Sequence, residues 1–546
     1  MLRLTGYGVR NLRALSDTGI IELKPITILV GKNSAGKSTF ARVLPLLKQS
    51  AERRKQAPLL WFGRLVDFGS FAEALTSNSS SREIELLLRF SAPPAIYTGR
   101  RAQIRPDTDV AHIQSHIDVV MTLGSDSDDS RTILKRLKID LFGITVRIAV
   151  EGSRDIQLQI SGQNILVPDG ARLVLAEGAI LPQPRLLYQA QISNTTVRDA
   201  AYFEPQARAK LGTTQVRSAI SAFVHGNTLD ERKDEIAERL PLASLPLLLQ
   251  HCQELGGAPD TWRANFKGVS ASSSVPLATL QRSLVLHKLE SLLQELDQAT
   301  QLFCDGISYL EPLRATAQRY YRREEVSTDE LDPKGLNTTF FIQGLTVRER
   351  ESLNDWLNKT FGFTLTVKTA GGHSTLNISV ADGAESRNMA DVGLGYSQLT
   401  PVAIQLWAAT RRLQSRPISS RNRVTFGMVR PRENRAIVVV EQPELHLHPA
   451  YQAKLADVLA LCATHGVQSE NTGQPLSRAE IVAETHSPNL INRLGELICE
   501  GKLSPDDVQV LVFEAVELSP NNTTVRKATF DTNGILQNWP IGFFDY

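Results

Sequence analysis

The spacing of apolar residues divides the chain into three stretches with different predicted structure. In residues 1–195, apolar runs of strand length, such as IELLLRF, IDVVMTL and IQLQI, alternate with polar connections. From 196 to 303, apolar residues recur every three or four positions, which is the period of amphipathic helices. Residues 304–546 show both patterns. The chain is therefore predicted to be α/β, with a β-rich N-terminal lobe, an inserted helical region and a mixed C-terminal lobe.

A stripe of leucines marks the helical stretch. It consists of Leu277, Leu280, Leu284, Leu289, Leu292, Leu293 and Leu296. Stripes of this period usually pack against other elements, so a buried face is expected in preference to a partner-binding surface. The preceding residues 268–276, GVSASSSVP, are expected to form a flexible joint.

The N-terminal residues predict strands, a glycine-rich turn and a helix in succession. Strands are expected over 2–9, 20–23 and 26–30, and a helix is expected from about Ser38. The turn GKNSAGKST, at 31–39, matches the phosphate-binding pattern GxxxxGK followed by Ser or Thr. Its position after a strand and before a helix is the context that this pattern requires.

The turn carries the candidate nucleotide-binding residues. They are Asn33, Ser34, Ala35, Gly36, Lys37, Ser38 and Thr39. Glycines let backbone N–H groups turn toward phosphate oxygens, and the following helix directs its positive end to them. Lys37 is expected to bridge the β- and γ-phosphates, and the Ser38 hydroxyl is expected to ligate Mg²⁺. ATP and Mg²⁺ are therefore the predicted cofactors.

An acidic residue ends a second predicted strand far downstream. The run AIVVVE is apolar and rich in β-branched residues, as buried parallel strands are, and it ends at Glu441. A carboxylate in that place would hold Mg²⁺ through water, together with Ser38. Glu441 is therefore the candidate catalytic residue and magnesium ligand of this strand.

Three further motifs surround this strand and carry a family resemblance. DVGLGYSQL, at 391–399, resembles the signature of ABC-type ATPases, and ELHLHP and ETHSP follow the strand. With these motifs the chain resembles the RecF, SMC and OLD branch of that superfamily. The runs EQPELHLHP, THSP and WPIGFFDY are similar to ATPases of bacterial anti-phage systems such as Septu. The resemblance covers about 1–90 and 305–546 and implies an ABC-ATPase head with the P-loop NTPase fold.

The resemblance also implies roles for single residues. Gly395, Ser397 and Gln398 would bind the γ-phosphate held by the opposite subunit of an ATP-sandwiched dimer or higher homo-oligomer, through a helix N-terminus. His486 would be the switch histidine that contacts the γ-phosphate. Residues 67–71, DFGSF, stand in the place of the Q-loop but lack its glutamine.

Gln442 stands where many members of the family carry the glutamate that polarises the attacking water. An amide cannot accept a proton, and loss of a general base typically lowers the rate by on the order of 10²–10⁴. We therefore predict slow hydrolysis, with Glu444 and His486 as the groups that could position water instead. For His446 and His448, a metal site is the alternative to a turn that packs against the strand.

Composition and charge add limits. Sixty Lys and Arg against 58 Asp and Glu give a formal charge of +2, so any nucleic-acid surface must be a local patch. The four cysteines lack metal-ligand or disulfide spacing, and the N-terminus lacks an apolar signal segment. A cytoplasmic protein without membrane contact is expected.

Two clusters of basic residues are candidate nucleic-acid surfaces. Eight arginines and one acid lie between Arg411 and Arg435, in a segment that either contacts phosphates or forms a solvated loop. Residues 309–323 combine tyrosines with arginines, which either stack on a base or pack between lobes.

The motifs and the resemblance are compatible with three functions. The first is a nucleotide-dependent sensor that regulates an effector nuclease, by resemblance of the HNH type, in anti-phage defence; a retron-linked version would add a reverse transcriptase and its RNA–DNA product. The second is a RecF-like ATPase of DNA repair or recombination. The third, an OLD-type nuclease, is disfavoured, because such enzymes need a further acidic domain and only about sixty residues follow His486.

Overall fold

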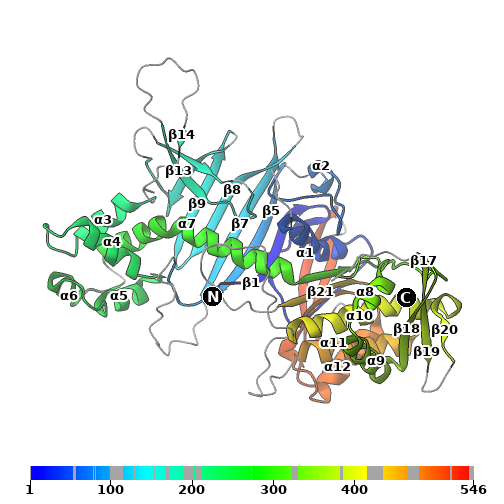
Figure 1. The fold of residues 1–546 in the computed structure, drawn as a ribbon. Helices are drawn as coiled ribbons and strands as arrows, with labels where there is room; N and C mark the ends of the chain where they lie inside the picture. The colour runs from blue at the N-terminus through cyan, green and yellow to red at the C-terminus, as the bar shows by residue number, and fades with distance from the viewer. Residues whose placement is uncertain are drawn as a thin grey trace.

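A large mixed β-sheet, covered by helices, dominates the computed structural model of the protein (Figure 1). The described residues are 2–52, 57–77, 79, 81–98, 115–126, 131–152, 154–167, 171–176, 178–189, 202–203, 211–271, 274–322, 330–380, 385–414, 435–464, 479–516 and 519–539. Strands and helices both run through the chain, so the predicted α/β class is confirmed.

Five parallel strands form the part of the sheet that carries the nucleotide-binding motifs. In spatial order they are β16 (Ile307–Leu310), β21 (Ala436–Glu441), β22 (Ala479–Glu484), β4 (Ile26–Gly31) and β23 (Val508–Val516). Every residue of β4 and of β21 is buried, as expected for central strands of a sheet covered on both faces. This order places strands from both ends of the sequence side by side.

Alternate residues of these strands enter two hydrophobic clusters on opposite faces of the sheet. Leu29 and Val439 belong to one cluster, and their strand neighbours Ile28 and Val440 belong to the other. The helices of the first face are α1 (Lys37–Ala51) and α7 (Val275–Gly306), and those of the second are α10 (Leu394–Gln414), α11 (Pro449–Thr464) and α12 (Pro488–Cys499). The period of two along each strand therefore builds both halves of the core.

An antiparallel array continues the sheet and confirms the predicted β-rich part of the N-terminal stretch (Figure 1). Its strands pair in the order β1 (Arg3–Leu12), β5 (Ile84–Ala92), β7 (Ser115–Ser125), β8 (Thr132–Leu141), β9 (Ile144–Glu151), β10 (Asp155–Ile160), β12 (Ala171–Leu175), β13 (Pro184–Gln189) and β14 (Tyr202–Phe203). Shorter strands of the large sheet are β2 (Leu15–Asp17), β3 (Ile21–Glu22) and β11 (Gln163–Asn164), whereas β6 (Ala95–Ile96) pairs with residues 242–243 in a separate two-stranded sheet. Burial alternates along β8, because one face of the array packs on the core.

The predicted helical region contains α7 and four shorter helices in its described part. The shorter ones are α3 (Thr213–Ser221), α4 (Asp230–Arg239), α5 (Leu245–Gln253) and α6 (Asp260–Phe266), with strand β15 (Leu242–Ala243) between α4 and α5. They lie at one end of the molecule, and α7 runs from them along the sheet toward α1 (Figure 1). The seven leucines of the stripe are buried, which confirms the predicted core packing. The prediction of a flexible joint over 268–276 is wrong at its C-terminal end, because Ser274 caps α7 and residues 275–276 are helical.

The C-terminal stretch forms a separate, smaller sheet and also adds a further strand to the large sheet. The small sheet contains β17 (Tyr321–Arg322), β18 (Phe363–Ala370), β19 (His373–Val380) and β20 (Arg387–Asn388), beside α8 (Thr338–Gly344) and α9 (Val347–Phe361). Strand β24 (Ser519–Phe530) pairs with β23 and β2 and precedes β25 (Leu536–Gln537). The predicted boundaries at 195 and 303 stay a prediction, and α7 crosses the second one as a continuous helix to Gly306.

Candidate nucleotide site

The glycine-rich turn joins β4 to α1 in a conformation that requires glycine at two positions. Gly31 has a φ of 153°, and a Cβ there would lie 2.4 Å from the carbonyl oxygen of Phe513. Gly36 has a φ of 88°, and a Cβ there would lie 2.6 Å from Leu15. Both the left-handed backbone and the close neighbours exclude a larger residue. The predicted turn is therefore present, and α1 starts directly after it.

Lys37 folds back under the turn. Its Nζ donates to the carbonyl oxygens of Gly31 at 3.0 Å and Lys32 at 2.9 Å, and burial lowers the pKa of its ammonium group. Of the other predicted residues, Asn33 and Ser34 are exposed, Ser38 is half-buried, and Ala35, Gly36 and Thr39 are buried. The ammonium group therefore lies inside the loop that the sequence pattern assigns to phosphate.

Ser38 contacts a carboxylate, but not the one predicted. Its Oγ donates to Oε2 of Glu484, the last residue of β22, at 2.6 Å. Lys37 Nζ lies 3.8 Å from Oε1 of the Glu484 carboxylate. This carboxylate is buried, and burial raises its pKa. A hydroxyl and a carboxylate are the hard oxygen donors that Mg²⁺ prefers, so these residues fit the predicted ion.

Glu441, the predicted magnesium ligand, is held by two other side chains. Nε and Nη2 of Arg42, on α1, each donate to its carboxylate at 2.7 Å. Tyr309 Oη, on β16, donates to Oε1 at 2.7 Å. The structure therefore brings Ser38 to Glu484 and pairs Glu441 with an arginine and a tyrosine.

The chain turns sharply after β21 and borders a cavity. Gln442 has a φ of 43°, and its N–H donates to the carbonyl oxygen of Glu484 at 2.8 Å. The cavity has a volume of about 500 Å³ and is lined by Asn33, Gln442, Glu444, Leu445, His446, Gln452, His486, Ser487 and Pro488. It joins the tip of the phosphate loop to three of the predicted catalytic residues.

Glu444 and His486 are linked beside this cavity. Oε1 of Glu444 accepts a hydrogen bond from the backbone N–H of His486 at 2.7 Å. Burial raises the pKa of Glu444, and burial together with nearby Lys37 lowers the pKa of His486, which favours its neutral ring. Oε2 of Glu444 and Nε2 of His486 are buried without a hydrogen-bond partner among the described residues. Both atoms can therefore accept or donate a further hydrogen bond.

The signature segment begins α10 beside the turn that follows β21, since a Cβ on Gly395 would lie 3.2 Å from the carbonyl oxygen of His446. Gly393 and Leu394 are exposed at the helix start, whereas Ser397 is buried and donates from Oγ to the carbonyl oxygen of Leu394 at 2.8 Å. The amide of Gln398 accepts from the N–H of Arg314 at 3.3 Å and donates to its carbonyl oxygen at 2.9 Å. The side chains of Ser397 and Gln398 are thus engaged within their own chain.

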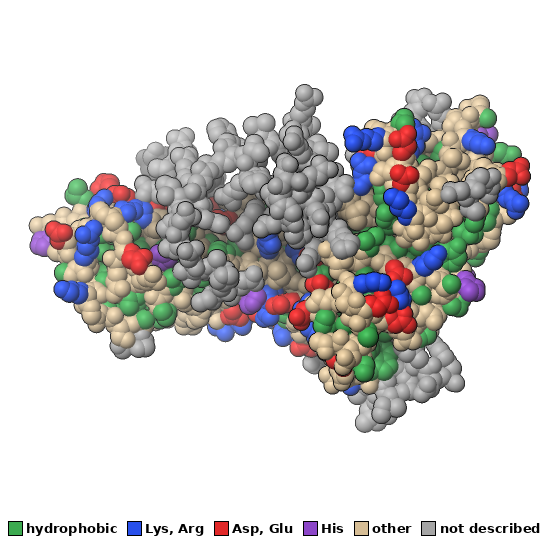
Figure 2. Space-filling view, turned by 90° about the horizontal axis from the view of Figure 1, so that it is seen from below, with side chains coloured by type: hydrophobic (Ala, Val, Ile, Leu, Met, Phe, Trp, Pro, Cys, Tyr) green, Lys and Arg blue, Asp and Glu red, His purple; other side chains and the backbone are tan. Residues whose placement is uncertain are grey.

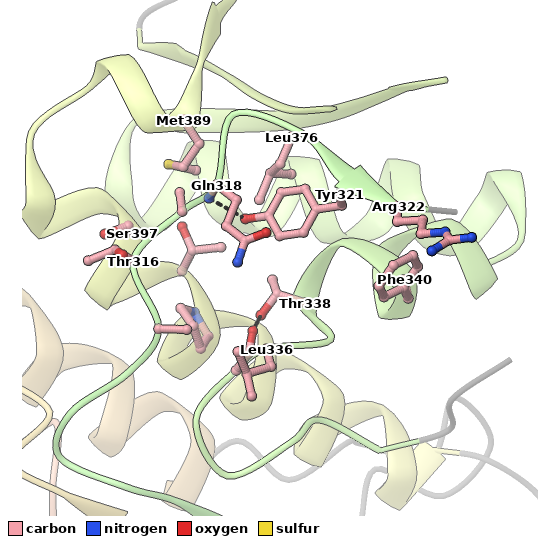
Figure 3. Close-up of a pocket in the computed structure, with 15 residues that line it drawn as sticks. Thr316, Gln318, Tyr321, Arg322, Leu336, Thr338, Phe340, Leu376, Met389 and Ser397 are labelled. Carbon is pink, nitrogen blue, oxygen red and sulfur yellow. Dashed lines mark hydrogen bonds between the residues drawn. The ribbon is translucent and has the colours of Figure 1, made fainter. Parts of the chain in front are cut away.

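Ser397 borders a second cavity, of about 250 Å³, whose lining shares no residue with the first (Figure 3). In this view Ser397 lies beside Thr316, on the other side from Arg322 and Phe340. A hydrogen bond from the Gln318 N–H to Tyr321 Oη, at 3.0 Å, joins two of the residues that line this cavity. None of Gly395, Ser397 and Gln398 lines the cavity at the phosphate loop of the same chain, although Gly395 lies against His446, which does line it.

The remaining motifs form local contacts. In the 67–71 segment, Ser70 begins a capping box with Glu73 for the short helix α2 (Phe71–Ala74), and Arg13 lies over the ring of Phe68. His446 has a φ of 63°, and His448 Nδ1 accepts from the N–H of Ala450 at 3.3 Å, at the start of α11. These contacts are those of turns and helix caps.

The two basic clusters have different outcomes. In the 309–323 cluster, Tyr309 and Arg314 are buried, as the packed alternative predicts, whereas Arg319 and Tyr320 are exposed. Residues 415–434 of the arginine-rich segment lie outside the described residues. At its ends, Arg411 pairs with Glu349 and Arg435 pairs with Glu480.

Two general expectations concern metals and membranes. The cysteines are free, with Cys252, Cys304 and Cys462 buried and Cys499 exposed. In the part of the chain that the structure describes, no three or more His, Cys, Asp or Glu residues are grouped as a metal site. None of the described helices combines the length and the apolar character that crossing a bilayer requires.

A phosphate loop between a strand and a helix, with carboxylates at the ends of the next two parallel strands on one side, β22 and β21, defines a P-loop ATPase of the α/β class. The chain belongs to the family described as "AAA ATPase domain", which matches residues 7–151 and 283–491. Residues 503–545 match a family described as "Protein of unknown function (DUF3696)".

Solved structures with some likeness to the chain are heads of SMC proteins. One is the Smc head domain of Pyrococcus furiosus with an extended coiled coil, bound to the C-terminal domain of ScpA, at 9% identity, TM-score 0.31 and 97% coverage of both chains. Another is the SMC head domain from Thermotoga maritima, at 8% identity and TM-score 0.30, covering 96% of this chain and 98% of that one. These scores are too low to add to the family assignment. No curated protein matches the sequence.

Sequence reasoning missed the partners of both carboxylates. A signal existed for Glu484, which ends an apolar strand just as Glu441 does. No local signal existed for Arg42, because it pairs with a residue 399 positions away. For Tyr309 the sequence indicates only membership of an aromatic and basic cluster.

Proposed function

We propose that the protein binds Mg-ATP between two copies of itself and hydrolyses it slowly, as a nucleotide-dependent clamp. The observation that carries this proposal is the place of Gln442. It directly follows the end of β21 and lines the cavity that Asn33 and His486 also line. A neutral amide orients water but does not take its proton. Tight binding without rapid turnover suits a switch better than a motor.

The start of α10 supports the dimer. Gly393 and Leu394 are exposed there, and a Cβ on Gly393 would meet no atom within 4 Å outside its chain neighbours. Exposed helix N-termini attract anions such as phosphate. Because none of residues 393–398 lines the cavity at the phosphate loop of the same chain, a γ-phosphate that reaches this helix end is expected to come from a second copy.

Gln442→Glu tests the slow step. The carboxylate supplies the missing proton acceptor, so kcat is expected to rise by on the order of 10² at saturating Mg-ATP, with little change in nucleotide affinity. Steady-state phosphate release measures kcat, and isothermal titration calorimetry measures affinity.

Gln452→Glu is the matched control, because Gln452 lines the same cavity but bonds to Leu447 and Ser487. This variant is expected to leave kcat within a few-fold of the parent. A parent that already turns over at about 1 s⁻¹ or faster, the ordinary range of enzymes, would contradict the slow clamp. So would an unchanged rate in Gln442→Glu.

The partner of the clamp is proposed from the family resemblance. We propose that the closed and open dimers regulate a separate effector nuclease of the HNH type in anti-phage defence, with a reverse transcriptase and its RNA–DNA product in a retron-linked version. Co-expression with the products of neighbouring genes, followed by nuclease assays with and without ATP, tests this role. DNA-stimulated ATP turnover by the isolated chain would favour the RecF-like alternative instead.

A further inference from the structure

The nucleotide site holds two buried carboxylates in equivalent places. Glu441 and Glu484 are the last residues of the neighbouring parallel strands β21 and β22, and they are paired in register. Their exposed fractions are 1% and 3%. A buried charge needs a partner, and the two carboxylates have partners of different kinds.

Glu441 has little capacity left for a metal ion. It accepts two hydrogen bonds from the planar guanidinium of Arg42 and one from Tyr309, all at 2.7 Å. The bidentate arginine pair neutralises the carboxylate and occupies both of its oxygens. An ion that reached Glu441 would have to displace Arg42 or share its oxygens with a cation.

Glu484 has the contacts that a magnesium-binding carboxylate needs. Its Oε2 accepts from Ser38 Oγ, which is the hydroxyl that the phosphate-loop pattern assigns to Mg²⁺, at 2.6 Å. Its only cationic neighbour within ion-pair distance among the described residues is Lys37, at 3.8 Å. Lys37 is also the residue that the pattern assigns to the phosphates, so both neighbours of Glu484 belong to the nucleotide loop.

From this difference we infer that Glu484, and not Glu441, is the carboxylate that holds Mg²⁺ together with Ser38. Arg42 keeps Glu441 as a neutralised pair that ties α1 to β21. The inference rests on the proposed function, because the ion is that of the bound Mg-ATP. It replaces the assignment of the ion to Glu441 that the sequence predicted. Glu484 acts directly or through a water, since Mg²⁺ keeps several waters in protein sites.

The isosteric variants Glu484→Gln and Glu441→Gln, in the full chain, separate the two carboxylates. Calorimetry measures ATP affinity in Mg²⁺ and in EDTA, and electron paramagnetic resonance measures Mn²⁺ bound in the ATP complex. The parent is expected to bind ATP more tightly with Mg²⁺. Glu484→Gln is expected to lose this difference and to weaken Mn²⁺ binding by on the order of tenfold or more, whereas Glu441→Gln keeps both within a few-fold.

Two further variants distinguish a loss of metal binding from a loss of the fold. Arg42→Met combined with Glu441→Gln removes the ion pair as a unit and is expected to retain the Mg²⁺ effect. Glu484→Asp keeps the charge on a side chain shorter by one methylene, so Mn²⁺ is expected to bind, but more weakly than in the parent. Circular dichroism checks the fold of each variant.

The outcomes distinguish this inference from the proposed function. Loss of the Mg²⁺ effect in Glu441→Gln alone, or equal loss in both single variants, overturns the assignment to Glu484. Full Mn²⁺ affinity in both Glu484 variants overturns it as well. A parent that binds no ATP in either medium overturns the proposed function itself.

Discussion

Arg314 is a buried arginine that joins the signature helix to the catalytic turn. Its Nη2 donates to the carbonyl oxygens of Glu441 at 2.8 Å and Gln442 at 3.2 Å, while Gln398 holds its backbone. Burial lowers its pKa to about 10, yet the group remains charged at neutral pH. Glu444 is a nearby counter-charge. Removal of the guanidinium would leave the carbonyl oxygens of Glu441 and Gln442 without this donor and would remove a positive charge near Glu444.

We predict that Arg314→Leu lowers the free energy of unfolding by about 1–3 kcal/mol, the usual cost of leaving a buried hydrogen-bond acceptor without its donor. Arg319→Leu is the control, because Arg319 and its partner Asp391 have side chains 59% and 43% exposed. Exposed pairs contribute about 0–1 kcal/mol. Chemical denaturation of both variants measures the difference, and similar losses in the two would show that Arg314 is not a structural link.

His251, on α5, is expected to make stability depend on pH. Its Nδ1 lies 3.4 Å from Tyr97 Oη, and burial lowers its pKa below the ordinary value. Above that ordinary value, about 6.5, the ring is neutral in both the folded and the unfolded chain. As the pH falls through it, the unfolded chain takes up a proton before the folded chain does, so stability is lost.

His251→Gln removes this titration. Between about pH 7.5 and about pH 5.5, the variant is therefore expected to lose less free energy of unfolding than the parent. Chemical denaturation at the two pH values gives the change in free energy of unfolding for the variant and for the parent. The contributions of the other titrating groups cancel when the two changes are subtracted. An equal or larger loss in the variant would contradict the lowered pKa.

Single residues were predictable from sequence where one contiguous motif defines them. Residues 33–39 could be assigned to phosphate binding because the pattern is contiguous. The positions of Gly36 and Lys37 within the loop are what the pattern requires. The partner of Glu441 could not be assigned, because it depends on how α1 lies against β21 and β16. Ser38 finds Glu484 for the same reason, since only the strand order shows that β22 lies next to β4.

Among the elements, α7 connects the helical region to the sheet. It packs against α1, β1 and α3, and its leucine stripe lies in the same hydrophobic cluster as the phosphate-loop helix. We predict that Leu289→Ala lowers the free energy of unfolding by about 2–5 kcal/mol, because a cavity forms at a fully buried site.

Gln294→Ala, at an exposed position of the same helix, is the matched control and is expected to change stability by about 0.5 kcal/mol or less. Urea denaturation followed by tryptophan fluorescence compares the two variants with the parent. Equal effects would mean that the stripe is not a core.

The strands that sequence predicted and those that it missed differ in one property. β4 and β21 are almost wholly apolar and rich in β-branched residues, so their burial was evident from the sequence alone. β24 has the sequence SPNNTTVRKATF, which is largely polar, and pairs with β23 through a hairpin. Backbone pairing, and not an apolar pattern, makes this segment a strand.

At the scale of the whole molecule, the site is assembled from segments far apart in sequence. The parallel order of β16, β21, β22, β4 and β23 places the N-terminal loop beside two C-terminal strand ends. The order of motifs predicted this convergence through the family resemblance, but not which carboxylate meets Ser38. Acidic and basic side chains are interspersed on the face shown in Figure 2, as the small net charge leads one to expect.

The proposed dimer makes a prediction about mixtures of two defective variants. Lys37→Ala removes the phosphate-loop half of a site, and Gly393→Glu places a repelling carboxylate at the start of α10, where open space avoids a clash. Each variant alone is expected to remain monomeric with Mg-ATP, whereas an equimolar mixture forms heterodimers with one intact site. Light scattering with and without ATP measures the mass, and slow hydrolysis at Gln442 keeps the complex closed meanwhile. A mixture that behaves as the average of its two components would mean that α10 and the phosphate loop do not act across two chains.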